Sequence, residues 1–590
     1  MNYPILSKVN SPADIKGMDI DELRGLCAEI RSALLDKLSA LGGHVGPNLG
    51  MVEAIVALHY VFDAPEDKIV FDVSHQSYVH KMLTGRRRAF TDPAHYGDVT
   101  GYTQPRESEY DLFSVGHTST AVSLASGLAK ARDILGEKEN VVAVVGDGAL
   151  SGGQAFEGLN IGATLGSNFI VIVNDNDMSI AENHGGLYAD LRLLRNTNGE
   201  GEPNYFRSLG YSYRYVRYGN DLRSLIEAFR AVRDIDHPVV VHINTMKGMG
   251  LPVAEAHKEQ FHYTGPFDLR SGAPLNSAPS GQTPKTYNQI FADHILTLMK
   301  SNPRLVALTA GTPGAIGFGP EKRREAGRRF IDTGIAEQDA VSMSGGLAKG
   351  GMRPVFGVVA SFLQRAYDQL SQDVALNGLP AVFTVFYSGV FAMNDETHLG
   401  FFDVSLASNI PGVIFLEPTC LEEYIAMLDW AIAQEKAPVI IRTPGGPVRS
   451  DSSIELLQDY SEPQYEIVEQ GADVAVIAAG TFFEMGRRAT EIMKDKGLRP
   501  TLVNPRCVSA LDTKTLDSFR DYRLVITLED SIADGGFGQK VAAYLGQTPV
   551  EVRAMGLPKT FVNRFNASEF LSELGLTPEN IAAIAVESGK

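Results

Sequence analysis

The sequence predicts an α/β protein made of three doubly wound α/β domains with mostly parallel sheets. Short apolar runs rich in β-branched residues recur along the chain, as is typical of buried strands. Stretches of helical composition alternate with these runs, which is the order that gives parallel sheets covered by helices. Two segments rich in polar residues interrupt the alternation and divide the chain into three blocks.

The most informative stretch is a strand–helix–strand unit in the first block. Val141–Val145 and Phe169–Val173 are predicted to be buried strands, and Ser151–Leu165 the helix between them, with Phe156, Leu159 and Ile161 near one face. The first strand stops at Gly146-Asp147-Gly148, and the second at the polar run of residues 174–177. A right-handed crossover places such ends side by side at the carboxyl edge of a parallel sheet, where α/β proteins bind ligands.

The residues at that edge suit a hard cation that holds a phosphate. Asp147 offers a carboxylate, Asn176 an amide oxygen and Met178 a backbone carbonyl, and such oxygen ligands are typical of Mg²⁺ sites. Glycines at 146, 148, 152 and 153 allow close approach of the backbone. The alternative is an ordinary strand–turn–helix with an aspartate in its turn.

Composition narrows the class of protein. The 590 residues carry a formal net charge of −18, which argues against a nucleic-acid or anionic-membrane partner. Cys27, Cys420 and Cys507 show no CxxC spacing, as expected in a reducing compartment. The N-terminal residues contain no apolar run or basic leader, and no stretch has the roughly 18 apolar residues of a membrane span. We therefore expect a cytoplasmic protein.

The first block carries further candidate site residues. We expect helices at Ser11–Ile15, Asp19–Leu41 and Val52–Val61, with His44 in the glycine-rich turn 42–50. His75 follows a strand at Asp67–Val73.

Ser114-Val115-Gly116-His117 forms a turn before a helix of small residues, where a phosphate can approach backbone amides. Residues 184–203 look like a polar loop. Strands are expected at Tyr213–Tyr218 and Val239–Asn244, and Lys247 follows the second of these.

The second and third blocks repeat the alternation. The predicted division is a first domain at 1–270, a linker at 271–286, a second domain at 287–450, a linker at 451–464 and a third domain at 465–590. In the second domain the helix Glu337–Lys349 begins with an acidic residue, which is favourable at the positive end of a helix dipole. A further helix is expected at Ala360–Leu376, and His398 lies in a long polar loop.

Taken together, these motifs resemble the 1-deoxy-D-xylulose-5-phosphate synthases, a transketolase-like family of thiamine diphosphate enzymes. The resemblance runs nearly end to end, through GGHVGPNLG, SHQSYVHKMLTGR, ESEYDLFSVGHTST, GDG…NDND, NTMKGMG, QFHYTGPFD, GIAEQDAV, SFLQRAYDQ, THLGFFD and ITLEDS. It implies transketolase-type domains that bind the diphosphate (PP) and the pyrimidine (Pyr), a C-terminal domain and a homodimer. It also implies small-molecule substrates, namely pyruvate and an aldose or aldose phosphate, and the cofactors thiamine diphosphate and Mg²⁺.

The resemblance also assigns residues to roles. Asp147, Asn176 and the Met178 carbonyl match the metal ligands. Glu337 matches the glutamate that faces the aminopyrimidine and promotes its imino tautomer, and Phe362 the ring that stacks on it. His44, His262 and His398 match catalytic histidines on the substrate side, and Arg365 an arginine of the substrate site. The implied cofactor-binding set is His75, Ser114, Gly116, His117, Gly146, Asp147, Gly148, Ala149, Asn176, Lys247, Glu337 and Phe362.

Several positions depart from the family pattern. Tyr387 and Gly445 stand where arginines that grip the acceptor phosphate are expected, so Arg449 or Arg365 would have to compensate. Asn394 replaces an aspartate, Val359 a tyrosine and Asp339 a histidine, and the loop after Asn183 is shorter than usual.

Three hypotheses follow. The first is a synthase that joins pyruvate to D-glyceraldehyde 3-phosphate. The second is a related carboligase or transketolase with another acceptor or donor, and the third is a non-catalytic dimer that binds the cofactor. The presence of Glu337, His44 and His398 argues against the third.

Overall fold

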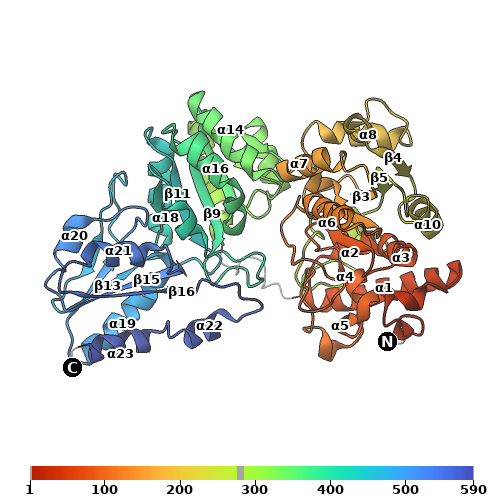
Figure 1. Ribbon diagram of the computed structural model, residues 1–590. Coiled ribbons are helices and arrows are strands. Elements are labelled where there is room, and N and C mark those ends of the chain that lie inside the picture. The colour runs from red at the N-terminus through yellow and green to blue at the C-terminus, as the bar shows by residue number, and fades with distance from the viewer. Residues whose placement is uncertain (1–2, 276–284, 589–590) are drawn as a thin grey trace. The chain divides into compact units, whose positions relative to one another are not determined.

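The computed structural model describes residues 3–275 and 285–588, which form two compact units. The first unit contains the described residues up to 275 together with 334–336, and the second contains the others. Residues 276–284 of the expected linker 271–286 lie outside the described residues. Three sheets with helices against them confirm the predicted fold class (Figure 1).

The sheet of the first unit has five strands in the order β1-β2-β3-β5-β4, and every neighbouring pair is parallel. Its strands are β1 Lys68–Phe71, β2 Val141–Gly146, β3 Phe169–Asp175, β4 Ser212–Val216 and β5 Pro238–Asn244. Because β2 and β3 are parallel neighbours, with Gly146 beside Asn174, their carboxyl ends meet as the sequence predicted.

The helices of the first unit cover this sheet. They are α1 Ile20–Leu41, α2 Val45–Gly50, α3 Val52–Val61, α4 Tyr78–Lys81, α5 Arg88–Thr91, α6 Ala121–Leu135, α7 Gly153–Gly162, α8 Leu187–Asn196, α9 Tyr205–Leu209, α10 Leu222–Arg230 and α11 Pro252–Ala256. A capping box at Asp19 starts α1, since the Asp19 carboxylate accepts hydrogen bonds from the amides of Asp21 and Glu22.

Three expectations for this unit were wrong. The turn after α1 contains a short helix, α2, because the flexible glycines are confined to its first two residues, Gly42 and Gly43. The expected loop 184–203 contains α8, whose Tyr188, Leu191 and Leu194 are buried along one face.

The third wrong expectation concerns β3, which was expected to end before residue 174. Strand β3 continues to Asp175, since that buried carboxylate has partners. Phe156 and Ile161 of α7 are exposed, because the helix packs against α6 through small residues: a side chain at Gly158 would meet Ser123 Oγ at 2.8 Å.

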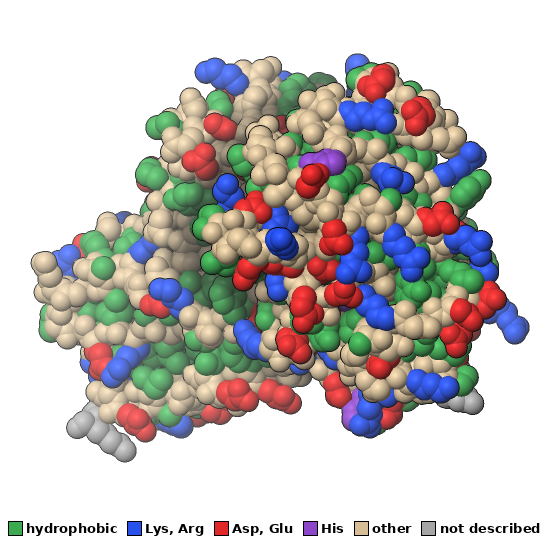
Figure 2. Space-filling model, turned by 45° about the vertical axis from the view of Figure 1, so that its right-hand side comes forward, with side chains coloured by type: hydrophobic (Ala, Val, Ile, Leu, Met, Phe, Trp, Pro, Cys, Tyr) green, Lys and Arg blue, Asp and Glu red, His purple; other side chains and the backbone are tan. Residues whose placement is uncertain are grey.

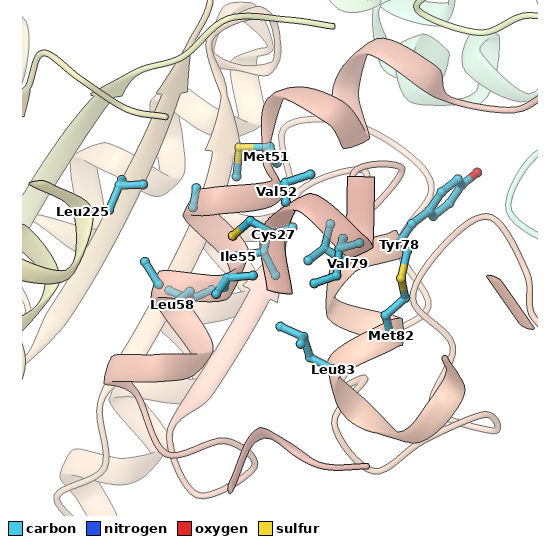
Figure 3. Close-up of a cluster of buried hydrophobic side chains, with 14 of the residues drawn as sticks. Cys27, Met51, Val52, Ile55, Leu58, Tyr78, Val79, Met82, Leu83 and Leu225 are labelled. Carbon is cyan, nitrogen blue, oxygen red and sulfur yellow. The ribbon is translucent and has the colours of Figure 1, made fainter. Parts of the chain in front are cut away.

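A hydrophobic cluster fixes the helices that carry the first two histidines. Figure 3 shows α3 side chains, including Ile55 and Leu58, among residues of α1, α4 and α10. Val79 and Leu83 are fully buried in this cluster, just after the turn that carries His75. The cluster is apolar and close-packed, so it holds α2, α3 and α4 in a fixed arrangement beneath the two histidine turns.

The second unit contains two sheets. The first has six parallel strands in the order β10-β11-β9-β8-β6-β7, and the second has five in the order β12-β14-β13-β15-β16, of which only β12 is antiparallel to its neighbour. The strands are β6 Leu305–Thr309, β7 Phe330–Asp332, β8 Arg353–Val359, β9 Val382–Ser388, β10 Ile414–Leu416, β11 Val439–Pro444, β12 Glu466–Glu469, β13 Val474–Ala478, β14 Pro500–Asn504, β15 Leu524–Ile532 and β16 Glu551–Leu557.

The helices of this unit are α12 Tyr287–Ser301, α13 Pro320–Ala326, α14 Glu337–Lys349, α15 Ala360–Leu363, α16 Tyr367–Gln369, α17 Asp403–Ala407, α18 Leu421–Ala433, α19 Phe483–Asp495, α20 Thr513–Asp517, α21 Phe537–Leu545, α22 Ala567–Glu573 and α23 Pro578–Glu587. The helix expected at 360–376 is broken into short α, 3-10 and π turns, and Ala366 leaves helical values with φ −108° and ψ 25°.

A buried charge cluster joins the two sheets of the second unit. The Arg442 guanidinium of β11 donates from Nε to Asp403 Oδ2 at 2.8 Å and from Nη2 to the Asp530 carbonyl of β15 at 2.8 Å. Glu417 Oε1 lies 3.6 Å from Arg442 Nη1. Burial raises the pKa of Glu417 to about 8, because Arg442 offsets only part of the cost of a buried carboxylate close to others.

Figure 2 shows acidic and basic side chains interspersed over the visible face. Within the described ranges, no helix is both long and apolar enough to cross a membrane.

The ends of β2 and β3 lie so close that a glycine is required at one position. A Cβ atom on Gly148 would stand 2.6 Å from Ser179 Oγ and 2.9 Å from its Cα. The same atom on Gly146 would meet nothing within 4 Å. Of the two glycines in the GDG turn, only Gly148 has to be a glycine for steric reasons within the protein, because a side chain there would clash with Ser179.

A first prediction concerns Glu417. Its pKa is about 8 in the folded state and near 4.5 when unfolded, so the unfolded state binds fewer protons and stability falls as pH rises between these values. Glu417→Gln should therefore raise the melting temperature above that of the wild type at pH 8 and hardly change it at pH 4.5. The gain is on the order of a few kcal/mol, at about 1.36 kcal/mol per pKa unit.

Calorimetry from pH 4.5 to 8.5 measures this difference, with Glu491→Gln, an exposed change on α19, as the control. A stability difference that stays constant across this range would contradict the assignment.

A second prediction concerns the GDG turn. Gly148→Ala should lower the free energy of unfolding of the cofactor-free protein by about 1–3 kcal/mol, because Ser179 has to move. Gly146→Ala, at φ −78° in open space, is the matched control and should change it by less than about 0.5 kcal/mol. Urea unfolding compares the two variants, and equal losses would show that the two turns are not in contact.

Candidate active site

A buried carboxylate marks the meeting point of β2 and β3. Asp147 follows β2 and is 1% exposed. Its Oδ2 accepts hydrogen bonds from the Met178 amide at 3.1 Å and from Asn183 Nδ2 at 2.8 Å, so residues beyond β3 are drawn to it. Burial raises the pKa of Asp147 well above its usual range, and the nearby charge of Asp175 raises it further.

Unsatisfied oxygens lie in the same turn. Among the described residues, the buried Oδ1 atoms of Asn176 and Asn183 have no hydrogen-bond partner. Buried polar atoms are rarely left unpaired, and a cation would satisfy such oxygens. The described part of the chain has no cluster of three or more His, Cys, Asp or Glu side chains placed for a metal. A mixed set of carboxylate, amide and carbonyl oxygens fits Mg²⁺ better than a transition metal.

A second aspartate, Asp175 at the end of β3, stabilises this turn, and its role was not predicted from the sequence. Asp175 Oδ2 lies 2.8 Å from His242 Nε2, and the Arg195 guanidinium binds both Asp175 oxygens at 2.7 Å. Arg195 Nη2 also lies 2.6 Å from Asp177. These contacts place α8 against the end of β3. They explain why Asp175 is buried and why the segment expected to be a loop forms a helix.

Three of the predicted histidines come together in the first unit. The ring of His44 lies 5.0 Å from that of His75 and 5.7 Å from that of His262, and His75 and His262 stack at 5.2 Å. Tyr102 and Tyr263 flank His44 at 5.8 and 5.0 Å, and sequence reasoning did not identify either ring.

Backbone pairing explains how such distant residues meet. The Gly43 amide donates to the Thr264 carbonyl at 2.8 Å and the Thr264 amide donates back at 3.1 Å, which joins the His44 turn to the His262 segment. Asn48 Nδ2 donates to the carbonyls of both His44 and His75 at 2.8 Å. The buried Asn48 side chain is therefore the element that ties the two histidine turns together, and no motif in the sequence signals this.

Lys247 extends this cluster. Its Nζ donates to the Ser179 carbonyl at 2.6 Å and lies 3.1 Å from His262 Nδ1. Burial lowers the pKa of Lys247 to about 7. Burial and the neighbouring Lys247 hold the pKa of His262 well below its usual range. At neutral pH His262 is thus uncharged, so its ring can accept a hydrogen bond.

The Ser114–His117 turn is held by a separate hydrogen-bond network, in which Gln104 and Asp111 are buried. Ser114 Oγ donates to Gln104 Oε1 at 3.1 Å, and the Gln104 amide donates to Asp111 Oδ2 at 2.7 Å. Arg86 binds both oxygens of Asp111. At the start of α6 the Asp72 carboxylate accepts from the Ser119 and Ala121 amides, so these two amides are already paired, and the approach of a phosphate to the 114–117 turn stays a prediction.

The candidate residues of the second unit form two pairs. Arg365 Nη1 donates to Glu337 Oε2 at 3.2 Å, and burial raises the pKa of Glu337 above its usual value although Arg365 opposes this. The Phe362 and His398 rings meet edge to face at 5.6 Å. Glu337 is 3% exposed at the start of α14.

The two departures from the family pattern, Tyr387 and Gly445, are fixed by the packing around them. Tyr387 has φ +56°, and its hydroxyl accepts a hydrogen bond from Asn288 Nδ2 at 3.2 Å. A Cβ atom on Gly445 would stand 2.5 Å from Ala392 Cα, so no larger side chain fits there as the chain is folded. Arg449 contacts Asp451 and Glu484, and Arg365 contacts Glu337, so both candidate substitutes have carboxylate partners.

Comparison with known proteins gives the family. Residues 6–202 match the family described as 1-deoxy-D-xylulose-5-phosphate synthase, residues 283–449 the transketolase pyrimidine-binding domain and residues 464–581 the transketolase C-terminal domain.

Relatives named 1-deoxy-D-xylulose-5-phosphate synthase match over nearly the full chain. That of Symbiobacterium thermophilum is 38% identical over 98% of this chain and 94% of its own length. The Geobacter sulfurreducens protein, named 1-deoxy-D-xylulose-5-phosphate synthase 1, is 38% identical over 98% and 96%, and that of Clostridium beijerinckii 36% over 99% and 99%. The chain therefore belongs to the 1-deoxy-D-xylulose-5-phosphate synthase family of thiamine diphosphate-dependent transferases.

Proposed function

We propose that this protein decarboxylates pyruvate and joins the remaining two-carbon unit to D-glyceraldehyde 3-phosphate, with thiamine diphosphate and Mg²⁺ as cofactors. The observation that carries the proposal is the buried Asp147 beside the unsatisfied Asn176 oxygen, in a chain whose relatives bear the synthase name over nearly their full length. The second hypothesis, another acceptor or donor, is less well supported because those relatives carry one name.

The metal end of the site is proposed to use Asp147, Asn176 and the Met178 carbonyl. A cation held by these oxygens would offset the repulsion between Asp147 and the negative charge of a bound diphosphate. Lys247 adds a positive charge near Asp147, as its effect on the pKa of that carboxyl indicates. His75, Ser114, Gly116, His117, Gly146, Gly148 and Ala149 are proposed to complete the surroundings of the cofactor.

The second unit is proposed to hold the pyrimidine end. Thiamine diphosphate supplies a carbon nucleophile that also accepts an electron pair, once a ring proton has been lost. The buried Glu337, with its raised pKa, is suited to share a proton with a ring nitrogen. Arg365 orients that carboxylate, and Phe362 offers a flat apolar face beside His398.

The histidines are proposed to move protons on the substrates. His262 is neutral at pH 7 and its ring can accept a hydrogen bond, while Lys247, with a pKa near 7, stabilises negative charge when protonated. His44 lies between His75, His262 and two tyrosines, a setting that orients a small polar substrate. His398 is oriented by the Thr397 hydroxyl, 2.8 Å from its Nδ1.

The organisation of the protein is also proposed. Domains at 1–270, 287–450 and 465–590 agree with one sheet in each of these ranges. Exposed apolar residues on the adjacent helices α6 and α7, Ile134, Leu135, Phe156 and Ile161, support a homodimer, since such side chains favour contact with a partner. Three scattered cysteines support a cytoplasmic location.

The function is tested by product analysis. With pyruvate, D-glyceraldehyde 3-phosphate, Mg²⁺ and thiamine diphosphate, the protein should release CO₂ and form 1-deoxy-D-xylulose 5-phosphate in equal amounts. Asp147→Ala should abolish both products, and calorimetry should show loss of Mg²⁺-dependent cofactor binding. Glu157→Ala, an exposed carboxylate on α7, is the matched control and should retain both. Product formation without added Mg²⁺, or by Asp147→Ala, would contradict the metal site.

A separate prediction concerns Glu337. Glu337→Gln should leave cofactor bound but slow exchange of the thiazolium C2 proton by about 10²-fold or more, since general acid–base assistance typically contributes 10²–10⁴-fold. NMR in deuterated buffer follows this exchange. Asp339→Asn, an exposed change in the same helical turn, should exchange at the wild-type rate. Equal rates in both variants would remove Glu337 from the mechanism.

A further inference from the structure

The segment that carries His398 is a closed loop. Residues 389–402 connect β9 to α17, and the Gly389 amide donates to the Gly400 carbonyl at 2.7 Å, which brings the two ends of the segment together. Within it, the His398 amide donates to the Asp395 carbonyl at 2.9 Å and Thr397 contacts both Asp395 and His398. The place of His398 therefore depends on where the two ends of the loop are fixed.

Arg442 fixes the C-terminal end. Its Nη2 donates to the Gly400 carbonyl at 3.3 Å, and its Nε donates to Asp403, the first residue after the loop, at 2.8 Å. The same Nη2 donates to the Asp530 carbonyl of β15 at 2.8 Å. One rigid guanidinium thus joins the loop end, the following helix and a strand of the other sheet, which a single ammonium group does not reach in the same geometry.

Asp530 fixes the N-terminal end. Its Oδ1 accepts from the Val390 amide at 3.0 Å, and its Oδ2 accepts from the Thr481 hydroxyl. The approach is so close that a Cβ atom on Gly389 would stand 2.1 Å from both carboxylate oxygens. The Ile532 amide also donates to the Phe401 carbonyl at 3.0 Å. Both ends of the loop are therefore held by the segment 530–532 and by Arg442, which binds that segment.

The charges around Arg442 make this anchor costly to disturb. Asp403 and Glu417 have oxygens with no hydrogen-bond partner among the described residues, and Asp530 and Glu529 are buried nearby. Arg442 is the cation that contacts Asp403, Glu417 and Asp530. Removing one partner of a buried ion pair is strongly destabilising, so the cluster has few alternative arrangements.

We propose that Arg442 is a positioning residue for the reaction: it fastens the C-terminal end of the 389–402 loop, binds Asp530, which fastens the N-terminal end, and so holds His398 against Phe362. This inference rests on the proposed function, in which His398 acts on the substrate. Arg442 itself acts only through the loop, and a small displacement of a reacting group is enough to slow an enzyme by about 100-fold.

The test compares two buried arginines. Arg442→Lys keeps the positive charge but loses the forked guanidinium group that donates in several directions. It should lower kcat by about 10- to 100-fold, while KM for pyruvate and the affinity for the cofactor change by less than about threefold. Arg506→Lys is the matched control, because Arg506 is equally buried and binds Glu423 and Glu466 with no hydrogen bond to the loop. It should change kcat by less than about threefold.

A double-mutant cycle distinguishes positioning from general damage. In the His398→Ala background, Arg442→Lys should have no additional effect on kcat beyond about threefold, since the residue acts through His398. An equal loss of kcat in both backgrounds, or an equal loss from Arg506→Lys, would overturn the proposal. If Arg442→Lys does not fold, Asp403→Asn, which removes the charge bound by Arg442 Nε, should give the same pattern with a smaller loss.

Hydrogen exchange tests the loop without relying on activity. Peptides covering 389–402 should exchange faster in the Arg442→Lys holoenzyme than in the wild type. In the Arg506→Lys holoenzyme they should exchange at the wild-type rate. Unchanged exchange in Arg442→Lys would overturn the inference even if the enzyme is active. A wild-type protein that makes no product would instead refute the proposed function, while faster exchange would still support the role of Arg442 in holding the loop.

Discussion

The structure depends on one buried carboxylate at the ends of two neighbouring strands. Asp147 is held by the Met178 amide and Asn183, which draws the turn after β3 over the end of β2. This arrangement places the unsatisfied Asn176 oxygen in the same turn and requires glycine at 148. A buried negative charge with unpaired oxygens nearby is unfavourable by itself, so cation binding and the stability of this edge are linked. Two further charges act on Asp147: Asp175 raises the pKa of its carboxyl, and Lys247 lowers it.

Much of the fold and half of the site could be predicted because the signals are local. Buried parallel strands are continuous apolar runs, and their polar ends identify the ligand edge. The histidines of the first unit were recognised as candidates and do come together. What brings them together was not predictable, because the pairing of Gly43 with Thr264 and the contacts of Asn48 join segments far apart in the sequence.

The wrong predictions also result from contacts between segments that are far apart in the sequence. Helix α8 lies in a stretch of mixed polarity, and its burial depends on Arg195 reaching Asp175. Asp175 itself looked like a strand terminator, since no residue near it in the sequence indicates that His242 will pair with it. Tyr387 and Gly445 were recognised as departures from the family pattern, but the crowding at Gly445 by Ala392 is visible only in the folded chain. An arginine at 445 would require residues 391–392 to move, so this departure belongs to the 389–402 loop as a whole.

The cluster of Lys247 with His44, His75 and His262 has a consequence for how charge enters the site. Lys247 is buried and lies near three half-buried histidines, yet His262 is neutral and burial lowers the pKa of Lys247 to about 7. An anion that enters favours the protonated lysine, because the two charges attract in a weakly screened environment. An anion bound beside Lys247 would therefore be taken up together with a proton, which makes its binding weaker as pH rises above 7.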